Sequence, residues 1–178
     1  MWTLKVLEGH TNHVWSVAFL SDDSHIVSGS TDKLVRVWDA LTGEMLKVLE
    51  GHGDHVFSVA FSSDDSRIVS CSEDISVRVW DASMGEMLKV LEGHTDDVSS
   101  VAFSNDDSRI VSSSTDKLVW VWDALTGEML KVLEGHTDYV RSAAFSSDVS
   151  HIVSGSFDKS VRVGCLDRQN TEGAGGPH

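Results

Sequence analysis

Hydrophobic and polar residues alternate along most of the chain in short runs that Ser, Asp or Gly residues separate. In the first unit of this pattern the runs lie near Val14–Phe19, Ile26–Ser30, Leu34–Trp38 and Glu44–Leu49. The runs are rich in β-branched and aromatic residues, which favour strands. No window sustains apolar residues at the 3.6-residue spacing of an amphipathic helix. The pattern therefore predicts an all-β protein built from units of four short strands.

The four-strand unit recurs every 42 residues. A Gly-His pair opens each repeat, and a Trp-Asp pair closes the third strand of the first three repeats: Gly9-His10, Gly51-His52, Gly93-His94 and Gly135-His136, then Trp38-Asp39, Trp80-Asp81 and Trp122-Asp123. A period of roughly 40–45 residues with these two motifs is typical of one four-stranded propeller blade. On these motifs the chain resembles the WD-repeat β-propeller family over about residues 1–163.

The repeats are unusually alike, since repeats one and three agree at roughly four-fifths of their positions. This is similar to the near-identical repeat arrays of fungal and bacterial NLR-type proteins, the NACHT or STAND class. The resemblance implies one propeller domain over 1–163, with repeats at about 9–50, 51–92, 93–134 and 135–163 and a separate strand over 2–8. Residues 164–178 lack alternation and have too few apolar residues to pack, so we expect an irregular, disordered tail.

The last repeat departs from the pattern, because Gly164-Cys165 replaces Trp-Asp and the fourth strand is missing. Segment 2–8 aligns with segment 44–50, which is a fourth strand. In the WD-repeat family such an N-terminal strand completes the C-terminal blade, and it would cover a sheet edge with unpaired backbone groups. The resemblance thus implies a small or partial propeller of four four-stranded blades in which segment 2–8 completes the last blade.

Four blades are few for a propeller of this family, and a closed ring of four would turn about 90° per blade. An open arc would instead expose an apolar face on each terminal blade, at a cost comparable to the whole stability of a typical domain. We therefore expect the arc to be completed by a homodimer partner, which exchanges segment 2–8 in an eight-bladed ring, or by further blades outside this chain.

Each repeat also carries a His, a Ser and an Asp in the same order, and the first three add a Trp. In the WD-repeat family the equivalent residues form a buried chain of hydrogen bonds from the indole to Ser, from Ser to His, and from His to the turn Asp. The resemblance assigns this structural network to His10, Ser28, Asp32 and Trp38; His52, Ser70, Asp74 and Trp80; and His94, Ser112, Asp116 and Trp122. Ser30, Ser72 and Ser114 are the alternative hydroxyls. The fourth repeat keeps His136, Ser154 and Asp158.

The same residue types could form a Ser-His-Asp catalytic triad. Near-identical copies 42 residues apart cannot all build one active site, whereas each blade needs the same internal link. Histidines on successive blades are also too far apart to share a zinc ion, whose bonds to nitrogen are about 2.0–2.1 Å long. The sequence therefore predicts no catalytic residue, no metal site and no cofactor, and a protein that is not an enzyme.

Positions that differ among the repeats are the candidates for function, because the shared positions serve the blade. The differences cluster three and five residues after each repeat-opening His and just before each turn Asp. In the family these positions resemble contact residues at the mouth of the central channel, and aromatic residues and Arg are enriched at binding hot spots. The candidate partner-binding residues are His13, Trp15, His55, Phe57, Glu73, Asp97, Ser99, Tyr139, Arg141 and Phe157. The alternative explanation is that the sequences of duplicated repeats drift at solvent-exposed loops, and that some of the aromatic side chains fill gaps between blades. Trp120, which replaces an Arg, is expected to pack within its blade.

Composition narrows the range of partners. The formal net charge of −14 disfavours nucleic acid, because Lys and Arg supply most of the affinity for phosphate backbones. No apolar run approaches the roughly 20 residues that cross a bilayer, and residues 1–5 lack the layout of a signal peptide. We therefore expect no nucleic acid or membrane partner and a cytoplasmic location. Cys71 and Cys165 belong to no repeating framework and are predicted to be free thiols.

These observations favour a non-catalytic scaffold or recognition module that binds a protein or peptide at the channel mouth, as the resemblance implies. Within an NLR-type protein this module would be the sensor part. The alternative is a lectin-like propeller that stacks small glycans on Trp15, Phe57 and Tyr139.

Overall fold

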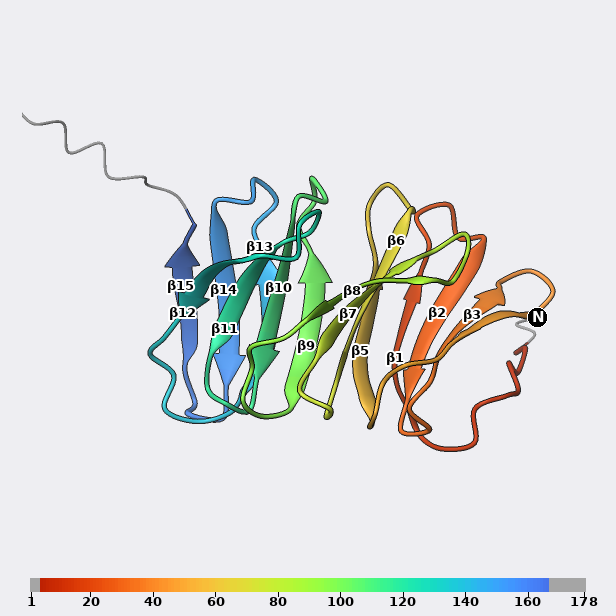
Figure 1. Cartoon of the computed structure of the whole chain (residues 1–178), viewed down its shortest axis with the longest axis horizontal. Helices are drawn as coiled ribbons and strands as arrows, with labels where there is room; N and C mark the ends of the chain where they lie inside the picture. The colour runs from red at the N-terminus through yellow and green to blue at the C-terminus, as the bar shows by residue number, and fades with distance from the viewer. Residues whose placement is uncertain (1–3, 167–178) are drawn as a thin grey trace, which may run out of the picture.

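The computed structural model describes residues 4–166, and this part of the chain forms fifteen strands and no helix (Figure 1). The strands make four antiparallel sheets, one for each repeat, and within each sheet the strands are ordered as they follow one another in the chain. Within residues 4–166 there is accordingly no helix of the length and hydropathy that would cross a lipid bilayer.

The first three sheets have four strands each. The first sheet contains β1 (Val14–Phe19), β2 (His25–Ser30), β3 (Val35–Asp39) and β4 (Met45–Leu49); the second contains β5 (Val56–Phe61), β6 (Arg67–Ser72), β7 (Val77–Asp81) and β8 (Met87–Leu91); the third contains β9 (Val98–Phe103), β10 (Arg109–Ser114), β11 (Val119–Asp123) and β12 (Met129–Leu133). In the described residues the fourth sheet has three strands: β13 (Val140–Phe145), β14 (His151–Ser156) and β15 (Val161–Cys165). The predicted strands of the first unit agree with β1–β4 to within one residue at each end.

Glycines shape the turn between the third and fourth strands of the first three blades. Gly43, Gly85 and Gly127 have φ values of 79°, 78° and 80°, a left-handed conformation that glycine adopts at little steric cost. The N–H of Gly43 donates to the carbonyl of Asp39 over 2.8 Å. Glycine at these three positions therefore lets the chain make the turn without steric strain.

The hydrophobic core lies between neighbouring blades. At the first junction the cluster joins Val27, Val35, Val37 and Leu49 of blade 1 to Val56, Val59, Ile68 and Trp80 of blade 2. The second junction repeats this pattern with Trp122 in the place of Trp80. The third junction contains fewer buried residues and no Trp, and Leu133 and Leu166 pack at its margin. Each blade therefore depends on its neighbours for burial, as expected of a repeat array.

The four blades form an open arc. Their innermost strands β1, β5, β9 and β13 contact one another in that order. The first sheet lies at one end of the molecule in Figure 1 and the fourth at the other. The predicted all-β propeller architecture is confirmed in its partial form, with the ring unclosed.

The prediction that segment 2–8 completes the last blade of the same chain is wrong for the described residues, and residues 2–3 lie outside them. Residues 4–8 form no strand and lie against blade 1, where Lys5 and Leu7 approach Gly43. The described residues supply β15 with no outer neighbour. The reason is the open arc, which places the start of the chain at the opposite end of the molecule from β15 (Figure 1).

The last repeat extends further than the sequence predicted. Gly164 and Cys165 belong to β15, and Leu166 packs against the third junction, so the blade continues beyond residue 163. Residues 167–178, which make up the rest of the expected tail, lie outside the described residues. Both cysteines are free, with Cys71 buried and Cys165 exposed, and burial raises the pKa of the Cys71 thiol.

Candidate binding face

A chain of hydrogen bonds runs in the same order through each of the first three blades. In blade 2 the indole N–H of Trp80 donates to Ser70 Oγ over 2.8 Å. Ser70 Oγ lies 2.8 Å from His52 Nε2, and His52 Nδ1 lies 2.9 Å from Asp74 Oδ2. The equivalent distances in blades 1 and 3 range from 2.7 to 2.9 Å. The structure therefore brings together the residues that the resemblance assigned to the network.

The alternative hydroxyls, those of Ser30, Ser72 and Ser114, make different hydrogen bonds. Ser30 Oγ accepts the N–H of Asp32 over 3.0 Å and donates to the carbonyl of Asn12 over 3.3 Å. Ser72 and Ser114 make the equivalent pair of hydrogen bonds in blades 2 and 3. Ser28 and Ser30 are two residues apart in one strand and share a face, so alternation alone could not separate their roles.

The carboxylate of the network is held in its ionised form. Burial by itself would raise the pKa of Asp74, but hydrogen bonds from His52 and Ser76 hold it well below the ordinary value. At Asp32 burial acts in the same direction and is outweighed by hydrogen bonds from Arg36 and His10. Burial lowers the pKa of His52 itself. In blade 2 the network therefore combines an imidazole whose protonation burial disfavours with a carboxylate that keeps its charge at neutral pH.

Blade 4 has the same network without its indole. His136 lies 2.7 Å from Asp158 and 2.9 Å from Ser154. Gly164 stands where the other blades have Trp, and a pocket of 340 Å³ opens beside it, lined by His136, Ser154 and Leu133 among others. The missing indole thus leaves a solvent-accessible space next to the hydrogen-bonded Ser and His.

The variable positions of each blade are joined into one face. The residue before the turn Asp donates its N–H, over 2.9 Å in every blade, to the carbonyl three residues after the repeat-opening His. The pairs are Thr31 with His13, Glu73 with His55, Thr115 with Asp97, and Phe157 with Tyr139. The backbone therefore places both sets of variable residues at the same end of the inner strands.

Four residues at one repeat position line a single pocket. Trp15, Phe57, Ser99 and Arg141 each lie five residues after the His of their repeat, and together they line a volume of 150 Å³. Trp15 and Phe57 meet edge to face with ring centroids 5.8 Å apart. The Ser99 hydroxyl is buried and has no hydrogen-bond partner among the described residues. The pocket thus combines an aromatic wall, an unpaired hydroxyl and a guanidinium group.

The remaining candidates lie on the same face, and Phe157 contacts the pocket residue Arg141. Arg141 also lies over the Phe157 ring, 5.2 Å from its centroid, and Tyr139 packs against the same ring at 6.2 Å. Burial and the nearby Glu73 raise the pKa of Asp97. His13 is exposed and contacts no other candidate through a side-chain hydrogen bond in the described residues. The face therefore has an acidic region beside blades 2 and 3 and an aromatic–cationic region on blade 4.

Comparison with known families identifies this architecture. The family described as WD domain, G-beta repeat matches the chain four times, at residues 1–39, 43–81, 85–123 and 127–163. The chain belongs to the WD-repeat family. The second, third and fourth WD units each begin just before the outer strand of the preceding blade. The first three units end at Trp-Asp, and the fourth ends at residue 163, just before Gly164-Cys165. By this alignment residues 4–8 hold the place of such an outer strand in front of blade 1.

A short part of the WD-repeat array is similar to a curated fungal protein. Over 39 residues, or 22% of this chain, it is 46% identical to the vegetative incompatibility protein HET-E-1 of Podospora anserina. The match covers 3% of that relative's length. It supports, in part, the resemblance to NLR-type arrays. WD repeats indicate a protein-interaction scaffold, and proteins of the family are generally non-catalytic.

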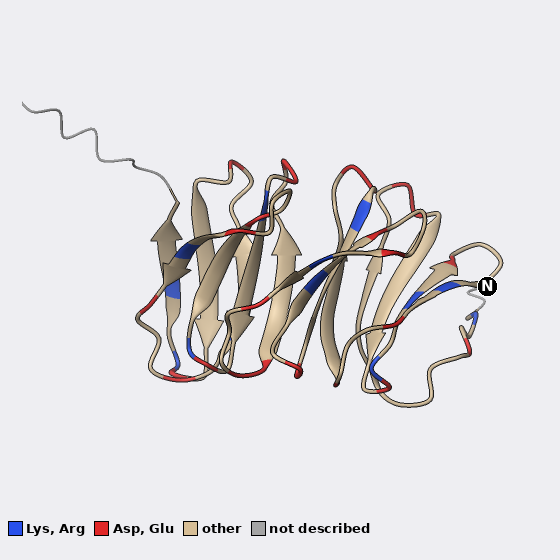
Figure 2. Ribbon diagram, viewed as in Figure 1, with Lys and Arg blue, Asp and Glu red and all other residues tan. Residues whose placement is uncertain are grey.

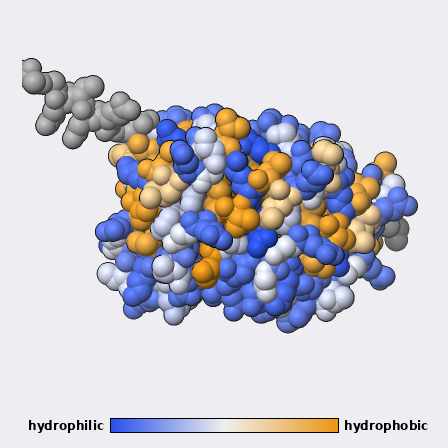
Figure 3. All heavy atoms as spheres, viewed as in Figure 1, coloured by the Kyte–Doolittle hydropathy of each residue, from blue (hydrophilic) through white to orange (hydrophobic). Residues whose placement is uncertain are grey.

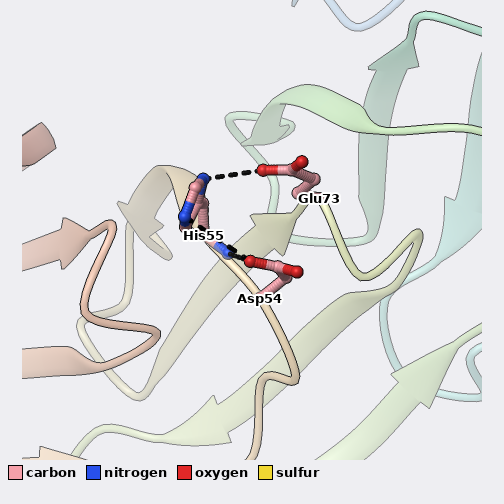
Figure 4. A group of neighbouring side chains, drawn as sticks. All are labelled: Asp54, His55 and Glu73. Carbon is pink, nitrogen blue, oxygen red and sulfur yellow. Dashed lines mark hydrogen bonds and ion pairs between the residues drawn. The ribbon is translucent and has the colours of Figure 1, made fainter.

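One cluster on the face was not anticipated from the sequence. Figure 4 shows His55 between the carboxylates of Glu73 and Asp54. His55 Nδ1 lies 2.7 Å from Glu73 Oε2, and the backbone N–H of His55 donates to Asp54 Oδ1 over 2.9 Å. One ligand atom from each residue lies within 4.8 Å of the others, which is compatible with a weak metal site. Lys33 Nζ lies 3.7 Å from Asp54, however, so an ion-pair cluster explains the arrangement.

Sequence reasoning also missed the aspartates that connect the blades. Asp65 accepts the N–H of Ser21 over 3.0 Å, and Asp107 accepts the N–H groups of Ser63 and Asp64 over 2.7 and 2.8 Å. Asp65 and Asp107 adopt positive φ. The signal available in the sequence was the Asp-Asp pair in each of these turns, at residues 64–65 and 106–107. Figure 2 shows that Asp and Glu gather in the loops at both ends of the strands. The acidic turns therefore link neighbouring blades in addition to shaping hairpins.

Trp120 lies within its blade as expected. Its ring stacks on Trp122 with centroids 5.1 Å apart and lies 5.0 Å from the His94 ring. The Trp120 indole nitrogen has no hydrogen-bond partner among the described residues. Trp120 therefore packs over the network of blade 3 and stands away from the pocket of Trp15 and Phe57.

Proposed function

We propose that this WD-repeat chain is a non-catalytic recognition module and that it binds a protein or peptide through the face around Trp15, Phe57, Ser99 and Arg141. The observation that carries the proposal is the single pocket to which all four blades contribute the same repeat position. These positions differ among repeats that are otherwise nearly identical. A binding role accounts for both their convergence and their variety.

The size of the pocket supports a macromolecular partner. Its volume of 150 Å³ is smaller than the roughly 300–1,000 Å³ typical of small-molecule sites. It has room for about one side chain, with the aromatic wall of Trp15 and Phe57 to receive an apolar group. Arg141 and the Ser99 hydroxyl can then bind polar groups next to that side chain.

The finer proposal is that this module serves as the recognition part of a larger NLR-type protein. The similarity to HET-E-1 supports this assignment, although it covers a small part of that protein. The cytoplasmic location expected from the sequence would fit the same role.

The test is selection of binders by the immobilised full chain from a random-peptide display library. We expect selected peptides to lose at least about tenfold in affinity when Trp15→Ala, Phe57→Ala and Arg141→Ala are combined, because hot-spot residues each contribute more than about 1 kcal/mol. The matched control combines Leu41→Ala, Met84→Ala and Leu125→Ala, three exposed apolar residues at equivalent turns. Equal loss in both variants, or no loss in either, would contradict the proposed face.

A glycan array separates the lectin-like alternative from the peptide proposal. Trp15 and Tyr139 are exposed enough to stack on sugar rings, whereas Phe57 is half-buried against Trp15. We expect no saturable glycan binding by the full chain. Glycan binding that disappears in the combined Trp15→Ala and Tyr139→Ala variant would favour the lectin-like function instead.

A further inference from the structure

The two ends of the arc carry the two halves of one junction. At the first internal junction Val59 and Val35 belong to the same buried cluster, and their exposed fractions are 5% and 0%. The equivalent residues at the ends are Val17 in β1 and Val161 in β15, which are 67% and 73% exposed. Figure 3 shows apolar side chains reaching the end of the molecule where β15 lies. Each end therefore presents the surface that the opposite end is built to cover.

A glycine marks where a further blade would sit. A Cβ atom at Gly29 in blade 1 would lie 2.7 Å from Val56 and 3.0 Å from Val59, so blade 2 leaves no room for a side chain there. Gly155 holds the same place in blade 4, and a Cβ atom there would meet nothing within 4 Å. A surface hollow of 390 Å³ lies beside Gly155 and Val161. The site that blade 2 fills on blade 1 is thus open on blade 4.

Residues 4–8 already lie where the outer strand of a preceding blade would be. Lys5 and Leu7 approach Gly43 of blade 1 just as the equivalent Lys and Leu of β4 approach Gly85 of blade 2. Val6 is 75% exposed, and residues 4–8 pair with no strand of their own chain among the described residues. The segment is therefore placed to pair with the free edge of a β15 strand that arrives in front of blade 1.

The loops show the same complementarity. Asp107 reaches across a junction to the N–H groups of the preceding blade's turn, and Asp65 does so at the junction before it. Asp23 has the same place in blade 1 and a similar φ of 59°, but its carboxylate accepts no hydrogen bond within the described residues. Ser147 in blade 4 is the counterpart of Ser21 and Ser63. An acceptor at one end thus matches a donor at the other.

We propose that a second copy of the chain docks head to tail, with its fourth blade against blade 1 of the first copy. Val14 and Val17 then cover Gly155 and Val161 of the second copy. Residues 4–7 pair with β15 of that copy as its fourth strand, and Asp23 accepts the N–H of its Ser147. The contact joins unlike surfaces, and two such contacts between two copies close a ring of eight blades.

The test is the native mass of the full chain, measured by light scattering after gel filtration over a range of micromolar concentrations. We expect twice the chain mass of 19.4 kDa. Gly155→Ile should reduce the mass to that of one chain without unfolding it, because the added side chain has free space until the second copy arrives. Leu125→Asp is the control, since Leu125 is exposed and lies away from both ends. A single-chain mass for the unmodified protein would overturn the proposal.

A mixing experiment tests the head-to-tail arrangement. Val17→Asp damages the blade 1 end and Gly155→Ile damages the blade 4 end, so each variant alone should have the mass of one chain. A mixture retains one intact junction and should recover the mass of two chains. If Gly155→Ile keeps the mass of two chains, or the mixture stays at one, the head-to-tail contact is ruled out. Circular dichroism of each variant shows that the blades remain folded.

Discussion

Blades 3 and 4 contain the same His–Ser–Asp sequence order but differ in how completely it is enclosed. The distances from His to Asp are 2.7 Å in both, and those from His to Ser are 2.8 and 2.9 Å. In blade 3 the Trp122 indole also donates to Ser112 and fills the adjacent space. In blade 4 a pocket of 340 Å³ takes that place. The comparison shows that the imidazole can be positioned without the indole, while the indole excludes water.

The two blades also differ in their neighbours. Blade 3 lies between two buried clusters. Blade 4 packs against one buried cluster on the side that faces blade 3, and its opposite face is exposed. Val111 in blade 3 is fully buried, and the equivalent Val153 in blade 4 is 42% exposed. Sequence identity between repeats therefore does not give equal stability, because burial is completed by the adjacent blade.

Removal of the indole from blade 3 should have the largest effect. Trp122→Ala deletes a buried ring and leaves Ser112 without its donor, so we expect a loss of about 3–5 kcal/mol in the free energy of unfolding. Urea unfolding followed by far-UV circular dichroism measures this. The control Trp15→Ala removes an exposed ring and should cost less than about 1 kcal/mol. Similar losses in the two variants would contradict the role assigned to the buried indole.

Removal of the imidazole should lower the free energy of unfolding by different amounts in blades 3 and 4. His94→Ala leaves the Asp116 carboxylate buried without its partner, which typically costs about 3–5 kcal/mol. His136→Ala should cost at least about 1 kcal/mol less, since water can enter from the pocket and solvate Asp158. Urea unfolding of the two variants gives the difference. A greater loss for His136→Ala would show that the open blade depends on its network more than the closed one.

Introducing an indole into blade 4 should recover part of the stability that blade 4 lacks relative to blade 3. Gly164→Trp places a ring in the pocket and offers an N–H to Ser154, and we expect a gain of about 0.5–2 kcal/mol. The nearest atom to a new Cβ is Leu133 Cδ1 at 3.1 Å, the end of a side chain that can shift slightly. Gly164→Ala adds the Cβ without the ring and serves as the control. If alanine stabilises as much as tryptophan, strand propensity rather than the indole is responsible.

Of the changes considered, acidification should have the smallest and most gradual effect on the free energy of unfolding. Because burial lowers the pKa of His52 from 6.5, the unfolded chain binds a proton more readily, so this contribution is full above pH 6.5 and declines below it. The lowered pKa values of Asp32 and Asp74 stabilise the fold above pH 3.8 and lose that effect as the pH falls further. Melting temperatures from pH 7 to pH 3 measure both. His52→Asn should flatten the decline between pH 7 and 5, and Trp15→Ala, which removes no titratable group, should not.

Much of the blade could be predicted from the sequence, since local alternation sets the strands and the repeat brings equivalent residues into register. The position of Gly43 also follows from residue type, because a turn with positive φ favours glycine. The arc could not be predicted in the same way, because the rotation between blades depends on side-chain packing that the period does not encode. The start of the chain was assigned to blade 4 because its sequence matches an outer strand, yet it lies beside blade 1.

Part of the candidate binding face could be predicted from the sequence. Comparison of the repeats pointed to Trp15, Phe57, Ser99 and Arg141, and the structure places these four around one pocket. The cluster of His55 with Asp54 and Glu73 was not foreseen, because two of its members were considered only as separate variable positions. Contacts that join different strands of one blade require the folded geometry.

The central claim is that each complete blade is held by its own hydrogen bonds from indole to carboxylate. Hydrogen exchange of the indole N–H groups, followed by ¹H–¹⁵N NMR in D₂O, tests it most directly. We predict that the signals of Trp38, Trp80 and Trp122 persist until the blades open, whereas the exposed Trp15 exchanges quickly. Exchange of Trp122 as fast as that of Trp15 would contradict the account.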